Sequence, residues 1–221
     1  MRFLVLLPIF IMLFNSSRAQ QIAVFDLFHD TIYAGTSYRP YVKPIGNFYF
    51  ATDVVGIDPA VISNISRWAS RGTGMDGLAD SSKGYAKLIL TKFFAGIQKA
   101  DPKFFDDSIM ENRANVMLGH LCFLGLDRGR PRLVSVTVYM NKGIRQPIVI
   151  SFSKEDAATA IVGATGMRPT NRVYGNAGLS RVAWLKKRMA LWTGKDPDGS
   201  QAGRPIDVLL LTKNGAVWTR Q

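Results

Sequence analysis

The residue types that most often carry chemistry are scarce in this chain. Its 221 residues include two histidines, His29 and His120, and one cysteine, Cys122. A structural zinc site usually needs four cysteine or histidine ligands, so these residues cannot fill one. No G-x-S-x-G, H-E-x-x-H, Walker-type or dinucleotide-binding motif occurs. We therefore expect neither a metal nor a cofactor.

His120 and Cys122 lie in one run, 115–126, which is largely apolar at both its odd-numbered and its even-numbered positions. This pattern predicts a strand buried on both sides. The turn residues 128–131 and the run 133–140 predict that the chain returns as the second strand of a hairpin. We expect His120 to be a hydrogen-bonded core residue rather than a ligand or base. Apolar surroundings likewise argue against Cys122 as a nucleophile.

The stretch from Gln20 to Tyr38 is the most suggestive place for a reactive centre. Two apolar runs, 22–25 and 31–34, flank a polar break at His29 and Asp30, which predicts a β-hairpin. If residues 1–19 are removed as a signal peptide, the first strand of this hairpin starts almost at the new N-terminus. Terminal residues usually fray unless they are tied down, and one known reason to bury a free N-terminus is to use it in catalysis.

These residues resemble the opening of a proteasome β-type subunit, a family with an N-terminal nucleophile. Gln20 falls at the nucleophilic threonine, Thr36 and Ser37 fall at an Asp-Ser pair, and Lys43 falls in the lysine-bearing strand. The turn 163–166 is similar to a Gly-Ser-Gly loop near that active site, with Thr165 at the serine; a plain helix stop is the alternative. The segment 203–218 resembles the closing hairpin of secreted bacterial proteins with this fold.

The resemblance implies an α+β fold, a four-layer α/β/β/α sandwich. The order of the elements expected from the sequence agrees with it. Strands are expected at 47–52, 115–126, 133–140, 148–152, 206–211 and 216–219, and helices at about 59–70, 81–100, 157–162 and 179–192.

The same resemblance implies a catalytic site that is formed but inactive, at Gln20, Thr36, Ser37, Lys43 and Thr165. In the family the first residue supplies a hydroxyl or thiol and its α-amine acts as the base. The Gln20 amide cannot attack a carbonyl, and Thr36 stands where an orienting aspartate belongs. Of the groups that the family's chemistry needs, only the lysine is matched, by Lys43. Ser37 offers a hydroxyl group without the other members of the site. The sequence therefore leaves open whether the protein is an enzyme.

Residues 1–19 have the pattern of a signal peptide. Arg2 precedes an apolar core, 3–14, and Ser17-Arg18-Ala19 forms a small-x-small cleavage site. That core is shorter than the roughly 20 residues needed to span a bilayer. We expect cleavage before Gln20, a single exported domain over 20–221 in the periplasm or outside the cell, and no transmembrane helix after cleavage. An uncleaved anchor is the alternative.

The chain is strongly basic, with a formal net charge of +12 that falls to +10 if Arg2 and Arg18 leave with the signal. Such a charge favours anionic partners. Nucleic acid is disfavoured because the basic residues are scattered and lack interleaved aromatics. The leading interpretation is a degenerate, non-catalytic binding or assembly module of the envelope, with a peptide or an anionic envelope component as partner. The alternative is a peptidase or amidase of the N-terminal-nucleophile type with a displaced active centre.

Overall fold

The computed structural model describes residues 23–36, 42–54, 59–110, 116–142, 148–162, 180–193 and 206–219. The predicted signal peptide, the turn 163–166 and the loop 196–203 lie outside these ranges.

The first sheet, sheet A, contains five antiparallel strands in the order β10-β9-β2-β1-β8. Its strands are β1 (Ala23–Phe28), β2 (Thr31–Thr36), β8 (Thr159–Val162), β9 (Asp207–Thr212) and β10 (Gly215–Thr219). The β1–β2 and β9–β10 pairs are the hairpins expected from the sequence. The turn of the second contains Asn214 and Gly215, and Gly215 has a φ of +121°, a conformation that favours glycine.

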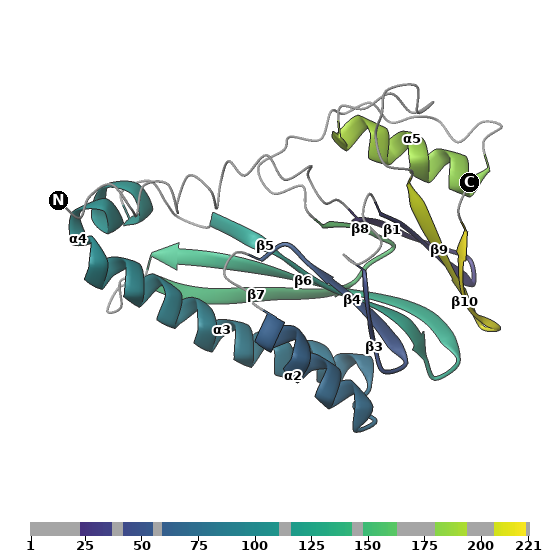
Figure 1. The fold of residues 1–221 in the computed structure, drawn as a ribbon, viewed down its shortest axis with the longest axis horizontal. Coiled ribbons are helices and arrows are strands. Elements are labelled where there is room, and N and C mark those ends of the chain that lie inside the picture. The colour runs from purple at the N-terminus through teal and green to yellow at the C-terminus, as the bar shows by residue number, and fades with distance from the viewer. Residues whose placement is uncertain are drawn as a thin grey trace.

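The second sheet, sheet B, is also antiparallel and runs β3-β4-β5-β6-β7. Its strands are β3 (Lys43–Ile45), β4 (Phe48–Thr52), β5 (Val116–Asp127), β6 (Arg130–Lys142) and β7 (Ile148–Asp156). The expected β5–β6 hairpin is confirmed. In Figure 1, β5, β6 and β7 extend past the shorter strands of sheet A.

The helices are α2 (Pro59–Ser70), α3 (Met75–Ala100), the short α4 (Pro102–Phe104) and α5 (Arg181–Thr193), with a π-helical turn η2 at Phe105–Met110. The start of α3 was predicted at residue 81, but the helix begins six residues earlier. Met75, Leu78 and Ala79 are fully buried. Their packing extends the helix through a glycine-rich segment whose local propensity alone favours a break.

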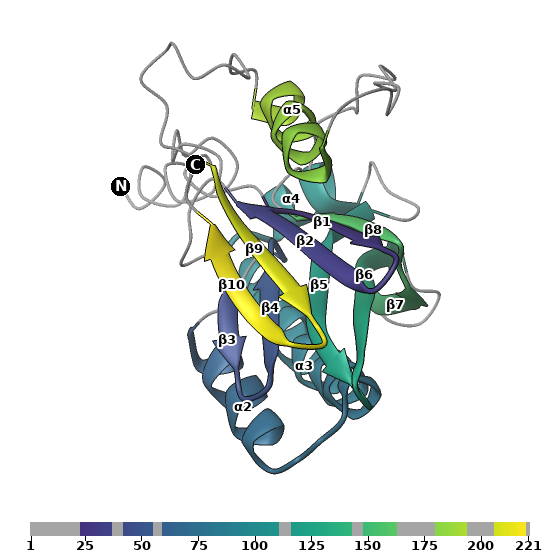
Figure 2. The ribbon, with the colours of Figure 1, turned by 90° about the vertical axis from the view of Figure 1, so that its right-hand side faces the viewer.

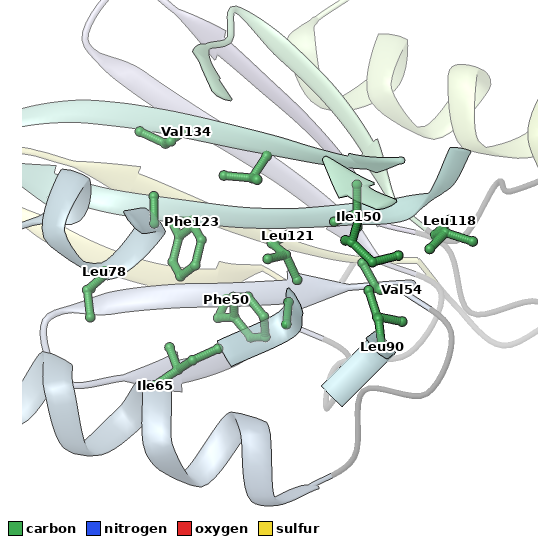
Figure 3. Packing of buried hydrophobic residues seen from close by; sticks show 14 of the residues in the cluster. Phe50, Val54, Ile65, Leu78, Leu90, Leu118, Leu121, Phe123, Val134 and Ile150 are labelled. Atoms are coloured by element: carbon green, nitrogen blue, oxygen red, sulfur yellow. The ribbon is translucent and has the colours of Figure 1, made fainter. Parts of the chain in front are cut away.

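Three hydrophobic clusters hold these elements together. The largest lies between sheet B and the pair α2–α3, where Phe50, Leu121 and Phe123 from the sheet approach Ile65 and Leu90 from the helices (Figure 3). A second cluster lies between the two sheets, and a third lies between sheet A and α5 (Figure 2). At this third contact a Cβ on Gly35 would come within 2.7 Å of Met189 Sδ, so glycine is what allows α5 to approach β2.

The structure contradicts the expected α+β fold, the four-layer α/β/β/α sandwich of the proteasome-like type. Two antiparallel sheets dominate the described chain and the helices are few. Sheet B is covered by α2 and α3, whereas sheet A carries one helix of 13 residues that contacts mainly β1 and β2. Within the described residues the helical cover is thus unequal, and they do not form two full helical layers.

The helix expected over 157–162 is also wrong, because this segment forms strand β8. Ala160 and Val162 point into the cluster between the sheets, while Ile161 packs toward α5. Burial with a period of two is the requirement of a strand between two cores. Pairing of β8 with β1 therefore overrides the helix propensity of the alanines around it.

Candidate functional site

The structure describes two of the five predicted site residues. Gln20, Ser37 and Thr165 lie outside the described residues. Thr36 is fully buried at the end of β2, opposite Ala23 of β1. Lys43 begins the edge strand β3 of the other sheet, opposite Phe50.

Thr36 and Lys43 therefore belong to different sheets and to different cores. Directly opposite residues of an antiparallel pair share a face. Ala23, and with it Thr36, faces the cluster between the sheets, whereas Phe50, and with it Lys43, faces α2 and α3. The described positions thus give no sign of the single convergent site that the sequence suggested.

A different group of polar residues lies in one row across sheet B. His120 of β5 is opposite Thr137 of β6, and Thr137 is opposite Ser153 of β7. Asp53, just after β4, extends the row because its N–H donates to the His120 carbonyl at 3.4 Å. The row is on the same face as Cys122, two residues along β5, and Cys122 belongs to the core between the sheets. The polar row therefore lies next to that core.

The closest contact in this row is between Asp53 and His120. The backbone N–H of His120 donates to Asp53 Oδ1 at 2.6 Å, and His120 Nδ1 lies 3.6 Å from the same oxygen. The Asp53 side chain is 6% exposed and that of His120 is 21% exposed. Among the described residues, Nδ1 is buried and has no hydrogen-bond partner. Chemically, this is an imidazole with one nitrogen turned toward a carboxylate and part of its ring open to solvent.

A β-bulge brings the two residues together. The β5–β6 register shifts between Met117 and Gly119, and Gly119 has a φ of +138°. A Cβ at Gly119 would lie 2.7 Å from Asp53 Oδ1 and 2.8 Å from the Val54 nitrogen. Only glycine permits both this backbone conformation and this close approach.

His120 therefore differs from the expected core histidine. It is only partly buried, and its row continues into Thr137 and Ser153. Asp53 was missed by sequence reasoning altogether. The one local signal was Gly119, since a glycine inside a strand often marks a bulge or a close backbone approach.

Cys122 behaves as expected. Its thiol is buried and lies 3.8 Å from Ser135 Oγ, to which it donates. Burial raises the pKa of the Cys122 thiol to about 12, since the apolar surroundings disfavour the thiolate. The nucleophilic form is therefore not populated at neutral pH.

An ionic network joins the start of α3 to sheet B. Arg132 of β6 donates hydrogen bonds of 2.7 Å to three aspartates: Asp76 of α3, Asp127 at the end of β5, and Asp156 of β7. Lys154 donates to Asp76 at 3.1 Å. Hydrogen bonds from Arg132 and then Lys154 lower the pKa of Asp76 to about 2. The same contacts raise the pKa values of Arg132 and Lys154, so all these groups stay charged over a wide pH range.

The rest of the helical surface over sheet B is basic. Residues 59–103 include no glutamate and only three aspartates, Asp76, Asp80 and Asp101. Asp76 and Asp80 are paired with Arg132, Lys154 and Lys83. Five exposed basic side chains on α2, just after it and on α3 make no ion pair with any described residue: Arg67, Arg71, Lys87, Lys92 and Lys99. We call these five the basic helical face.

Two kinds of feature are absent from the described residues, a membrane-spanning helix and a metal-binding cluster. Over these ranges, no helix is both long and apolar enough to cross a membrane. The same part of the chain contains no group of three or more histidine, cysteine, aspartate or glutamate side chains placed to hold a metal ion.

Comparisons with known proteins provide no family for this chain. No protein-family model matches it, and no curated protein matches it. The resemblance to the proteasome-like N-terminal-nucleophile family is contradicted by the predominantly β, two-sheet structure, and we do not assign the chain to that family.

Proposed function

We propose that this protein is an exported binding or assembly module whose partner is an anionic component of the cell envelope. The observation that carries the proposal is the basic helical face on α2 and α3. Phosphate-bearing lipid head groups are the chemistry that such a face would recognise, through charge attraction rather than through a shaped pocket.

The ionic network supports this proposal by explaining why the face is basic. The two aspartates at the start of α3 are turned toward Arg132, Lys83 and Lys154. Their negative charge is thereby compensated locally. Along the rest of α3, Lys92 and Lys99 are seven residues apart, two helical turns, and therefore project from the same side. Lys87 is also exposed, about 140° around the helix from Lys92.

An apolar residue on the same surface fits contact with a lipid head-group layer. Leu88 is 50% exposed, although it lies in the middle of a long, packed helix. It is four residues before Lys92, about one helical turn, so it shares the exposed side of Lys92. Basic residues around an exposed apolar side chain are typical of surfaces that lie at a membrane interface.

Binding to lipid vesicles tests the proposal directly. The protein should sediment with vesicles of phosphatidylglycerol but not with vesicles of phosphatidylcholine. Raising the salt concentration from about 0.05 M to about 0.5 M should release it, because the screening length shortens severalfold. Equal sedimentation with both kinds of vesicle, or binding indifferent to salt, would contradict a charge-driven partner.

Export is the second part of the proposal and has its own test. The signal-peptide pattern of residues 1–19 predicts a mature protein that begins at Gln20, as glutamine or as its cyclised form. Intact-mass spectrometry of protein recovered from outside the cytoplasm should give this terminus. Recovery of exported protein with Met1 still attached would show that the signal is not cleaved.

A further inference from the structure

The pair formed by Asp53 and His120 is not needed for binding an anionic surface. It lies on the face of sheet B that is turned toward sheet A, whereas α2 and α3 cover the other face. Its arrangement is costly, because it requires a bulge, a glycine in the left-handed region and a buried carboxylate. Strained backbone and buried charge of this kind often accompany a functional site.

We propose that His120 is a general base, held in position by Asp53, and that the site hydrolyses acyl esters or amides. Asp53 Oδ1 lies 3.6 Å from Nδ1, beyond hydrogen-bond distance, and its negative charge attracts a proton on that nitrogen. Because Nδ1 is buried, the solvent-exposed part of the side chain is on the rest of the ring. This leaves the lone pair of Nε2 as the proton acceptor.

The reaction would need no other reactant than water. As the oxygen of a water molecule bonds to the acyl carbon, Nε2 of His120 accepts one of its protons. The bond between the acyl carbon and the leaving alcohol or amine then breaks, and the imidazolium returns the proton to the leaving group. The products are a carboxylic acid and an alcohol or amine, and His120 is regenerated.

The remainder of the row suits a polar acyl substrate. Thr137 and Ser153 follow His120 at successive strand positions, each separated by about 4.8 Å, the spacing of strands in a sheet. Asn141 donates to Ser151 at 2.7 Å nearby on β6 and β7. Hydroxyl and amide groups spaced along a sheet can hydrogen-bond to the carbonyl and polar substituents of a substrate.

The two histidines of the chain provide a matched comparison. His29 lies in the β1–β2 turn with a φ of +50°, and asparagine tolerates that conformation. With the full chain and 4-nitrophenyl acetate as probe, His29→Asn should retain the rate of ester hydrolysis. His120→Gln should lower it at least a hundredfold, within the range that general bases contribute.

Asp53→Asn separates a positioning role from a structural one. Asparagine keeps an oxygen that can accept the His120 N–H but removes the negative charge that faces Nδ1. We expect kcat to fall about tenfold or more, while KM and the melting temperature stay close to those of the unaltered protein. A purely structural role would lower the melting temperature and leave the kcat of the folded fraction unchanged, which would overturn the assignment of Asp53.

A chemical test covers the case in which His120→Gln does not fold. In the His29→Asn protein, His120 is the only histidine, since the chain has two. Modification with diethylpyrocarbonate should abolish ester hydrolysis, and hydroxylamine should restore it. Absence of esterase activity in the unmodified protein, or activity that survives the modification, would overturn the proposal. Failure of vesicle binding would leave it intact, because the two sites lie on opposite faces of sheet B.

Discussion

At the scale of single residues, Gly119 gives the sharpest prediction. A methyl group added there would lie 2.7 Å from Asp53 Oδ1 and 2.8 Å from the Val54 nitrogen, at a φ of +138°. Gly119→Ala should therefore destabilise the protein by about 2–4 kcal/mol, from backbone strain and overpacking together. Urea unfolding followed by circular dichroism measures this change.

Gly84→Ala is the matched control. Gly84 is exposed on α3, and a Cβ there would meet nothing within 4 Å. Alanine should stabilise the helix by about 0.5–1 kcal/mol, because it has the higher helix propensity. Similar effects of the two substitutions would show that the bulge at Gly119 is not constrained.

Cys122 gives a second prediction at this scale. Since its thiol is buried and its pKa is raised to about 12, the folded protein should react with 5,5′-dithiobis(2-nitrobenzoate) only as fast as it unfolds. Addition of about 6 M guanidinium chloride, which unfolds most domains, should expose one thiol per chain at once. Rapid labelling of the folded protein would contradict the burial of Cys122.

The sequence predicts Cys122 well and Asp53 not at all, and the difference has a physical cause. Burial of Cys122 follows from its immediate apolar neighbours. The contact of Asp53 with His120 joins residues 67 positions apart, and it depends on the register of β4 against β5 and on one bulge. No local pattern specifies the register of two strands that are separated by so long a helical connection.

At the scale of elements, Arg132 is the residue that joins the start of α3 to β5, β6 and β7. Arg132→Met leaves Asp76, Asp127 and Asp156 without their shared partner. We expect a loss of roughly 1–2 kcal/mol in the free energy of unfolding at neutral pH, since these are charge-assisted but partly exposed bonds. Arg130→Met removes the same charge from an exposed side chain at the start of β6, and it should cost much less.

The stabilisation that the Arg132 network provides should also depend on pH. The pKa of Asp76 is lowered to about 2, so its ionised form stabilises the folded state above the pKa of an unfolded aspartate, about 3.9. This contribution should disappear as the pH falls from about 4 to about 2, and it should be below about 1 kcal/mol because the Asp76 side chain is 54% exposed. Thermal unfolding between pH 2 and pH 7 should show a shallower acid slope for Arg132→Met than for Arg130→Met. Equal slopes would contradict the role of the network.

Elements with strong local signals were predicted correctly, and elements decided by packing were not. The β5–β6 and β9–β10 hairpins follow from turn residues between apolar runs. The early start of α3 and the strand β8 do not, because each is decided by which side chains the neighbouring sheet can bury. Local propensity is a weak guide where tertiary packing opposes it.

At the scale of the whole molecule, the order of the strands and the distribution of the helices could not be inferred from single residues. Sheet A combines strands from the beginning of the described chain, from its middle and from its end. The predicted four-layer sandwich assumed two full helical layers, and in the described part of the chain sheet A carries one helix, α5. The excess of positive charge is visible in the sequence, but which of the basic residues are exposed on α2 and α3 required the structure.

The central claim is that the basic helical face, rather than net charge alone, binds an anionic envelope surface. Two variants of equal charge test it: Lys87→Gln, Lys92→Gln and Lys99→Gln on α3, and Arg130→Gln, Lys142→Gln and Lys213→Gln, exposed residues at strand ends and turns. Each removes three positive charges, and each basic residue near an anionic membrane contributes about 1 kcal/mol.

The measurement is the affinity of the two variants and the unaltered protein for phosphatidylglycerol vesicles. We predict that the α3 variant loses on the order of a hundredfold in affinity, as three such residues would require. The control variant should stay within about threefold of the unaltered protein, because screening limits charges far from the contact. Equal losses in both variants would contradict the claim, since binding would then follow net charge and not the face formed by α2 and α3.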